Sequence, residues 1–337
     1  MVFRLLLAFL LAQQPVIAQQ PVPAREPVAA PLPVIAHHPN HIDSLTTTDL
    51  VLAYVGKLTG HESETLQPTP GKKLFDKADL DNNGYTDLLF NGDGGSGSDL
   101  ARVTLVVLSF PGDSIVVRRL PDEYFYDSFA VNIVKLDGQP YIHAYQVTRK
   151  FRDSWSLKKN KPIRKDYTEY RSDTLTWRQN ALLEIAPRVE HKIDSISYAL
   201  VGGFTIKGGF RLTIKQDSLL LEKEKDWLDT MNFGGGGIFI GRLDTAAHNR
   251  LYTLLECIDF PHLENDYSMS GSDASTGVLN ISYDNGRKKR IIDYGARGTY
   301  ALTALQNLLI GLLETQQWVQ VSKEDVLIDE SLVVEDP

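Results

Sequence analysis

Oxygen-bearing side chains between residues 79 and 87 give the strongest chemical signal in the sequence. The stretch reads DLDNNGYTD and places Asp79, Asp81 and Asn83 at alternate positions. Calcium is a hard cation that takes six to eight oxygen ligands, and alternate positions of a tight loop can turn such oxygens inward. Tyr85 can add a backbone carbonyl, and Asp87 completes the ligand set. The predicted metal site therefore comprises Asp79, Asp81, Asn83, Tyr85 and Asp87, with Ca²⁺ as a structural ion.

This loop differs from the calcium loop of an EF-hand. Gly84 stands at the sixth position, where the sharp turn is needed. An EF-hand also needs a bidentate glutamate at position twelve, and that residue is Phe90 here. A strand is therefore expected after the loop in place of a second helix. Asp93 and Asp99 follow in a glycine-rich segment and are further candidate oxygen donors, but nothing nearby supplies a nucleophile or a general base.

The pattern D-x-D-x-[DN]-G-x-x-D followed by a strand such as DLLF resembles the calcium loop of FG-GAP and VCBS-type repeats. The resemblance covers residues 74–92. In those families the loop recurs in one propeller blade after another, whereas it occurs once in this chain. The resemblance therefore implies one calcium loop, without a β-propeller and without the adhesive function that propellers often serve.

A second segment of chemical interest runs from residue 149 to residue 171. It holds nine basic and three acidic residues, with aromatic side chains between them. Basic residues among aromatics suit an anionic polymer, either an acidic glycan or nucleic acid. The alternative is a long hairpin whose tip is solvated and whose aromatic side chains pack on a sheet. The candidate anion-binding residues are Arg149, Lys150, Arg152, Lys158, Lys159, Lys161, Arg164 and Lys165.

Three weaker patterns have simpler structural explanations. His37, His38 and His41 are potential Zn²⁺ or Ni²⁺ ligands, but they end a proline-rich stretch that offers no neighbours to orient them. The glycines at 234–237 precede a strand, whereas a phosphate loop needs a helix there. Cys257 falls on an apolar helix face and is expected to be a buried thiol. No catalytic residue is predicted.

Short apolar runs separated by turn residues must position these groups in the first half of the chain. Hairpins are predicted across residues 111–113, 137–138 and 179–180, and their succession indicates an antiparallel meander. A helix is expected ahead of them, ending at Gly60. Its apolar face is predicted to comprise Leu50, Ala53, Tyr54 and Leu58.

In the second half, the order of elements is β-β-β-α-β-β-α. Hairpins are expected about residues 216–217 and at Asn285-Gly286, which favours the two positive-φ positions of a tight turn. One helix begins at Asp244 or Thr245, and the last lies within 300–318. This order predicts an antiparallel sheet with two helices packed on one side. The fold class is therefore α+β, with a β-meander domain followed by this sheet.

The N-terminus has the features of a secretory signal peptide. Arg4 precedes a short apolar run, and Val16 and Ala18 match the small residues of a cleavage site. The run is shorter than the roughly 20 residues that span a bilayer. We therefore expect cleavage after Ala18 and export of the mature chain, to the periplasm or the extracellular medium, without a membrane span.

Composition suggests how the 337 residues are divided. Residues 19–40 hold six prolines without a periodic pattern, which favours an extended spacer. A single cysteine allows no intrachain disulfide, and a net charge of −8 argues against a nucleic-acid surface across the whole chain. The predicted parts are a signal peptide 1–18, a proline-rich linker 19–42, a β-rich domain 43–202 with the calcium loop, an α+β domain 203–322 and an acidic tail 323–337.

The strand pair RLTIKQDSLLLE, the helix before LECIDF, the hairpin NISYDNGRKKRIIDYG and a last helix ending in a tryptophan lie within residues 211–318. Together they resemble an uncharacterised bacterial domain of exported proteins. That resemblance implies a compact α+β module and no catalytic residues.

Three functions are consistent with these features. The first is an exported, non-enzymatic binding or structural protein with one structural Ca²⁺ loop, whose partner would be an envelope protein or a glycan. The second is a hydrolase whose scattered site residues a single sequence does not reveal. The third is binding of an anionic polymer through residues 149–171.

Overall fold

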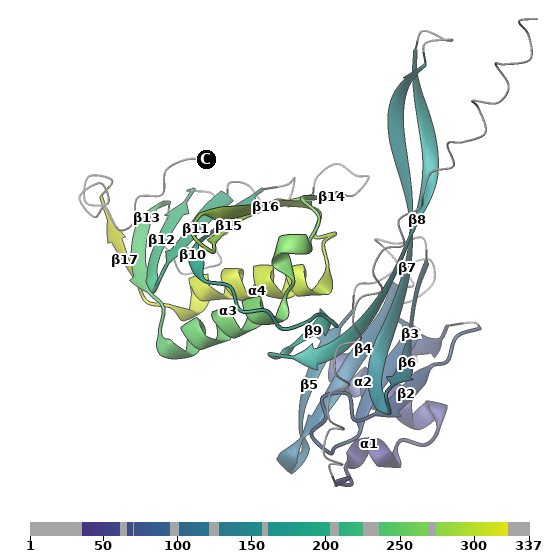
Figure 1. Ribbon diagram of the computed structural model, residues 1–337. Helices are drawn as coiled ribbons and strands as arrows, with labels where there is room; N and C mark the ends of the chain where they lie inside the picture. The colour runs from purple at the N-terminus through teal and green to yellow at the C-terminus, as the bar shows by residue number, and fades with distance from the viewer. Residues whose placement is uncertain are drawn as a thin grey trace, which may run out of the picture. The chain divides into compact units, whose positions relative to one another are not determined.

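A computed structural model describes residues 36–60, 66–69, 71–94, 101–120, 128–156, 161–202, 209–224, 236–268 and 274–322 (Figure 1). The chain divides into the units Met1–Ala36 and His37–Pro337, and the second is the one considered below. Its described residues form mainly antiparallel sheets with few helices, which fits the α+β class in its broad sense. In the described part of the chain, no helix is long and apolar enough to cross a membrane.

The first sheet follows two short helices, α1 (His41–Ser44) and α2 (Thr48–Thr59). Its order is β1-β3-β4-β5, with β2 paired to β3. The strands are β1 (Leu66–Pro68), β2 (Phe75–Ala78), β3 (Asp87–Gly94), β4 (Ala101–Phe110) and β5 (Ser114–Arg119). The predicted hairpin across residues 111–113 is confirmed, because β4 and β5 pair from Leu105↔Arg119 to Phe110↔Ser114.

Helix α2 is confirmed, but two of the four residues of its predicted apolar face, Leu50 and Ala53, are exposed. The structure buries Val51 and Val55 completely, whereas Leu50 is 46% exposed. Tyr54 and Leu58 pack partly against the same hydrophobic cluster as the two valines. Both stripes share Tyr54 and Leu58, so helical spacing alone does not distinguish them. Gly60 ends the helix in the left-handed conformation, at φ 69°.

Strand β3 lies between two hydrophobic cores, because successive side chains of a strand point to opposite faces. Leu88 and Phe90 are buried with Val55 of α2 in one cluster. Leu89, between them, is buried with Phe129 in the other. The strand that carries Asp87 is therefore fixed on both of its faces.

The second sheet has the order β6-β7-β8-β9, with β6 (Ser128–Leu136), β7 (Gln139–Ser156), β8 (Lys161–Arg178) and β9 (Ala181–Glu184). The hairpins predicted across 137–138 and 179–180 are confirmed. The expected single meander is instead split, since β5 and β6 belong to different sheets. Side chains from both sheets belong to one apolar cluster, so contact between the two sheets removes apolar surface of each from water.

The third sheet has eight strands in the order β14-β16-β15-β10-β11-β12-β13-β17. All neighbours are antiparallel except β14 and β16. The predicted hairpins β11–β12 and β15–β16 are confirmed. Strand β10 precedes residue 203, so the sheet begins one strand before the predicted domain boundary. The strands are β10 (Ile193–Val201), β11 (Gly209–Lys215), β12 (Ser218–Lys223), β13 (Gly237–Arg242), β14 (Asp266–Ser268), β15 (Thr276–Tyr283), β16 (Arg287–Tyr294) and β17 (Trp318–Val321).

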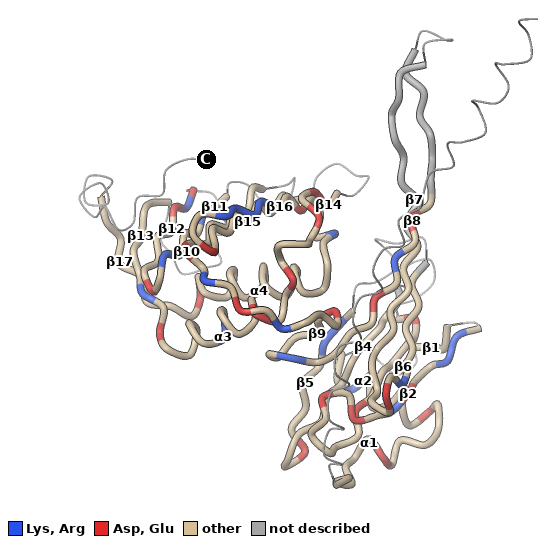
Figure 2. The backbone as a smooth tube through the Cα atoms, viewed as in Figure 1, with Lys and Arg blue, Asp and Glu red and all other residues tan. Residues whose placement is uncertain are grey.

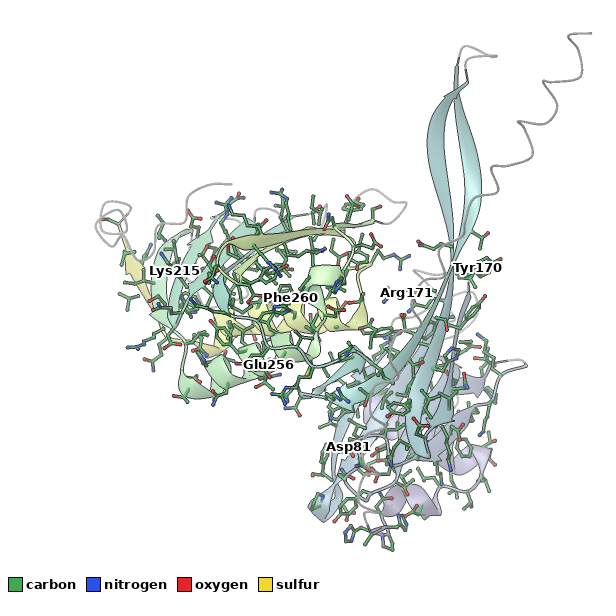
Figure 3. The ribbon with its side chains drawn as sticks, viewed as in Figure 1. Asp81, Tyr170, Arg171, Lys215, Glu256 and Phe260 are labelled. Carbon is green, nitrogen blue, oxygen red and sulfur yellow. The ribbon has the colours of Figure 1, made fainter. Side chains whose placement is uncertain are left out.

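Helices α3 (Thr245–Cys257) and α4 (Tyr300–Thr315) lie against one face of this sheet, as predicted (Figure 1). Asp244 caps α3 by accepting from Ala247 N, and Thr299 caps α4 by accepting from Leu302 N. Their apolar stripes and the sheet bury a common core around Phe260 (Figure 3). Cys257 is buried in this core, as predicted.

Glu184 connects the end of β9 to the start of α4. Its Oε1 accepts from Tyr300 N at 2.7 Å, and its Oε2 accepts from Ala301 N at 2.9 Å. Arg171 of β8, labelled in Figure 3, pairs with the same Oε1 at 2.9 Å. The first N–H groups of a helix lack partners within the helix, and a carboxylate there also interacts favourably with the helix dipole.

Candidate metal centre

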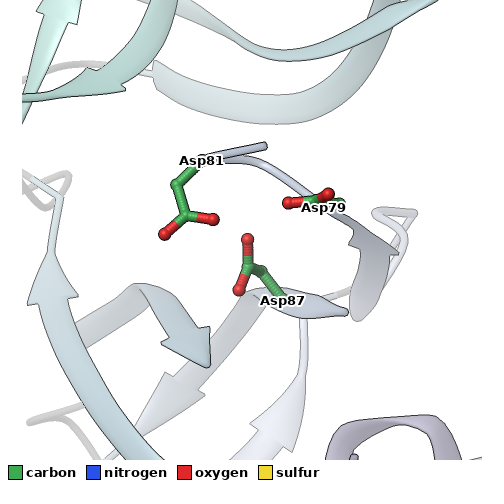
Figure 4. Close-up of side chains that lie close together, drawn as sticks. All are labelled: Asp79, Asp81 and Asp87. Carbon is green, nitrogen blue, oxygen red and sulfur yellow. The ribbon is translucent and has the colours of Figure 1, made fainter. Parts of the chain in front are cut away.

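The loop between β2 and β3 brings three carboxylates together (Figure 4). Asp79, Asp81 and Asp87 each offer one oxygen, and these oxygens all lie within 4.8 Å of one another. Calcium ligands lie roughly 2.3–2.6 Å from the ion, so two oxygens that share it can be up to about 5 Å apart. The spacing therefore fits three ligands of a single Ca²⁺.

Asp79 is held by the turn that follows it. Its Oδ1 accepts from Asn83 N at 2.9 Å, and its Oδ2 accepts from Gly84 N at 2.8 Å. Asn82 and Gly84 adopt positive φ angles of 61° and 89°, a conformation that asparagine and glycine tolerate best. Hydrogen bonds within the loop thus orient the carboxylate of Asp79.

Asp87 is the fully buried first residue of β3. Its Oδ1 accepts from Ser109 N at 2.8 Å, and its Oδ2 accepts from Leu80 N at 2.7 Å. Burial raises the pKa of Asp87 to about 7, and these two hydrogen bonds only partly oppose that effect. The nearby charges of Asp81 and Asp79 raise the pKa further.

Asp81 shows most directly that the residues fit a cation. Its Oδ2 accepts from Asn83 Nδ2 at 3.0 Å, but its Oδ1 is buried and has no hydrogen-bond partner in the described part of the chain. Burial raises the pKa of Asp81 to about 6, with the charge of Asp79 as the next cause. An anionic oxygen without a partner is costly to bury, and a bound cation would remove that cost.

Asn83 and Tyr85 lie in the same loop with other partners. Asn83 directs its Oδ1 to Tyr85 N at 2.8 Å and its Nδ2 to Ser109 O at 2.7 Å, in addition to Asp81. The Tyr85 ring stacks on His38 at a centroid distance of 5.1 Å. The structure brings Asp79, Asp81 and Asp87 together, while ligation by Asn83 and Tyr85 stays a prediction.

Of the two further candidate donors, Asp93 does not join the three carboxylates. Asp93 follows Asp87 by six residues along β3, which is about 20 Å at the usual strand rise. Asp99 lies outside the described residues. Phe90 is fully buried in a hydrophobic cluster, which agrees with the absence of an EF-hand ligand at that position.

Contacts from distant parts of the sequence hold the loop in place, and sequence reasoning missed them. His38 N donates to Gly84 O at 2.7 Å, and Asn40 Nδ2 donates to Thr86 O at 2.7 Å. Asn40 also forms a capping box with Asp43 at the start of α1, which the sequence N-H-I-D signals locally.

These contacts correct the end of the predicted linker 19–42. Its last residues form the start of α1 and a bridge to the metal loop. The three histidines of that stretch have separate partners: His37 lies 3.4 Å from Asp43 Oδ2, His38 stacks on Tyr85, and His41 tilts against Tyr54.

Six of the eight predicted anion-binding residues lie on strands β7 and β8, whereas Lys158 and Lys159 lie outside the described residues. Both strands have 18 residues and pair to their ends at Ser156↔Lys161, so the long hairpin is confirmed. The side chains of all eight candidates lie outside the described residues, and anion binding there stays a prediction. Figure 2 shows a second basic stretch, the residues RKKR at 287–290 on β16, which the sequence analysis did not single out.

Comparison with known proteins identifies one segment. Residues 210–313 match the family model of a domain of unknown function, DUF6438, which supports the predicted uncharacterised C-terminal domain. The match runs from β11 into α4 and leaves out both the carboxylate loop and strand β10. No curated protein and no solved structure matched the chain.

Proposed function

We propose that this chain is an exported, non-enzymatic binding or structural protein whose first sheet is stabilised by one Ca²⁺. The buried, unpartnered Oδ1 of Asp81 beside Asp79 and Asp87 carries the proposal. These three carboxylates would hold the ion, and Asp87 would tie it to the end of β4 through Ser109 N. The ion would neutralise charges that otherwise repel one another.

Export is proposed from the leader pattern that ends at Ala18. Extracellular calcium-binding modules work at dissociation constants of about 10⁻⁴–10⁻³ M, so even a weak site fills outside the cell. A chain with a single cysteine has no intrachain disulfide, and a bound ion is an alternative source of stability. The proposed export and the proposed calcium site are therefore consistent with each other.

The raised pKa values of Asp81 and Asp87 resemble those of an acid–base pair in a hydrolase. Asp87, however, is fully buried, and both of its oxygens accept backbone N–H groups. A substrate would need to displace those bonds to reach it. The arrangement supports a metal site over a catalytic pair.

The test is calorimetric titration of the EDTA-treated mature chain with CaCl₂. We expect one Ca²⁺ per chain and a higher melting temperature with calcium. Asp81→Asn keeps the size of the side chain but removes the charge, so binding should fall at least tenfold, which is about 1.4 kcal/mol. Asp113→Asn is the matched control, because Asp113 is exposed at the β4–β5 turn. Absence of calcium binding by the unmodified chain, or equal binding by Asp81→Asn, would contradict the proposal.

A further inference from the structure

Helices α3 and α4 line a groove of about 970 Å³, together with the end of β5 and the turn between β8 and β9. Residues spaced four apart line it from each helix, including Ala246 and Arg250 from α3 and Asn307 and Gly311 from α4. The lining of α4 extends from Tyr300 beyond its last turn, so the groove follows the full length of that helix. The shape suits an extended chain better than a compact ligand.

Gly311 leaves room for another backbone to approach the helices closely. Glycine in a helix interior costs roughly 1 kcal/mol relative to alanine. A Cβ atom at Gly311 would meet no atom within 4 Å, so packing among the described residues does not require glycine here. Glycine is also the residue that lets a backbone approach closely.

The groove carries positive charge and apolar surface. Arg118, Arg119, Arg250 and Arg297 line it, and Asp244 is the one carboxylate among the described lining residues. Asp244 already accepts hydrogen bonds from Ala247 N and Gln316 Nε2. A complementary chain would be acidic and would carry aliphatic side chains.

Residues 323–337, which lie outside the described part of the chain, have that composition. They read KEDVLIDESLVVEDP and contain six acidic residues and one lysine around two aliphatic triplets. We propose that this acidic tail docks along the α3–α4 groove, with its backbone over Gly311 and its carboxylates facing the arginines. This inference does not depend on calcium binding.

The tail is long enough to reach the groove. It follows β17, which begins at Trp318, two residues after the groove residue Gln316. Fifteen extended residues span about 50 Å, whereas a helix of 16 residues is about 24 Å long. The tail can therefore turn back from β17 and follow the whole of α4.

The test uses the full chain with a photoreactive side chain in the groove, Asn307→Bpa (p-benzoylphenylalanine). Asn307 is exposed and lines the groove, whereas Asn249 of α3 is exposed and is not a lining residue, so Asn249→Bpa gives the matched control. After irradiation, mass spectrometry of mixed ¹⁴N- and ¹⁵N-labelled copies separates crosslinks within one chain from crosslinks between chains. We expect intrachain crosslinks from position 307 to residues 323–337, at roughly tenfold higher yield than from position 249.

A second pair of variants separates docking from folding. Gly311→Ala should raise the melting temperature, because alanine favours helix, and should lower the crosslink yield, because its methyl group obstructs the tail. Gly311→Phe should remove the crosslink. The proposal is overturned if position 307 crosslinks to another segment or to the tail of another copy, if position 249 reacts equally, or if Gly311→Phe leaves the yield unchanged.

Discussion

Asp81 and Asp87 are two carboxyl groups whose protonation would oppose the proposed calcium binding. Burial raises the pKa of Asp81 to about 6 and that of Asp87 to about 7, both above the ordinary value of 3.8. Between about pH 4 and about pH 7, the folded, metal-free protein therefore binds more protons than the unfolded chain. The contribution of these two groups to the free energy of unfolding is fully present below about pH 4 and is lost as the pH rises towards about 7.

Calcium should reverse this dependence, because it would bind the deprotonated carboxylates. We expect the calcium-induced rise in melting temperature to be small at about pH 5 and large at about pH 8, because deprotonation precedes binding. Melting curves in EDTA and in CaCl₂ across this range would measure it. A rise of equal size at both pH values would contradict the assignment to these carboxylates.

At the scale of elements, Glu184 is the contact on which the start of α4 depends. It accepts from two helix N–H groups and pairs with Arg171. Glu184→Ala should therefore reduce the free energy of unfolding by about 1–3 kcal/mol, the cost of leaving such donors without partners. Urea denaturation would measure the change.

Glu256→Ala is the control for Glu184→Ala. Glu256 pairs with Arg188, whose side chain is 63% exposed. Exposed ion pairs contribute about 0–1 kcal/mol. Equal losses for the two variants would mean that Glu184 acts only as a surface charge.

Helix α2 offers a direct comparison between the face predicted from sequence and the face that the structure buries. Val51 is fully buried and Leu50 is 46% exposed. Val51→Ala should reduce the free energy of unfolding by roughly 2 kcal/mol, through lost burial and the cavity left behind. Leu50→Ala should cost well under 1 kcal/mol. A larger loss for Leu50→Ala than for Val51→Ala in chemical denaturation would instead support the face predicted from sequence.

The elements that could be predicted from the sequence are those whose signal lies within a few neighbouring residues. Asn285-Gly286 and Asp137-Gly138 specify tight turns by themselves, and both hairpins are present. The pairing of β10 with β15 joins residues about 80 positions apart, and no local pattern encodes such a partner. The placement of β5 and β6 in different sheets also depends on which apolar faces pack together, and turn residues carry no information about that packing.

At the scale of the whole molecule, one part of the candidate site could be predicted from local sequence, and the other part required the structure. Asp79, Asp81 and Asp87 lie within nine consecutive residues, so their spacing alone predicted the cluster. The contacts of Ser109 and Asn40 with that loop come from other elements and required the structure. The α3–α4 groove combines helices separated by more than 40 residues. Its charged residues form no motif that could be recognised in the sequence.

The leader gives a prediction for the whole chain. When a bacterial host exports the protein with its own leader, the mature N-terminus should be Gln19, because Val16 and Ala18 satisfy the small-residue rule. Intact-mass measurement of the exported protein would identify it. An Ala18→Arg variant, which breaks that rule, should accumulate uncleaved, and retention of the leader by the unmodified chain would contradict the prediction.

Cys257 gives this chain a built-in reporter of opening. It is the one thiol in the sequence and is buried at the end of α3, in the core shared by both long helices and the eight-stranded sheet. Its rate of reaction with a soluble disulfide reagent therefore measures how often that core exposes itself to solvent, without an engineered label. Following this rate with and without calcium would show whether an ion held near β3 slows motions that begin under α3.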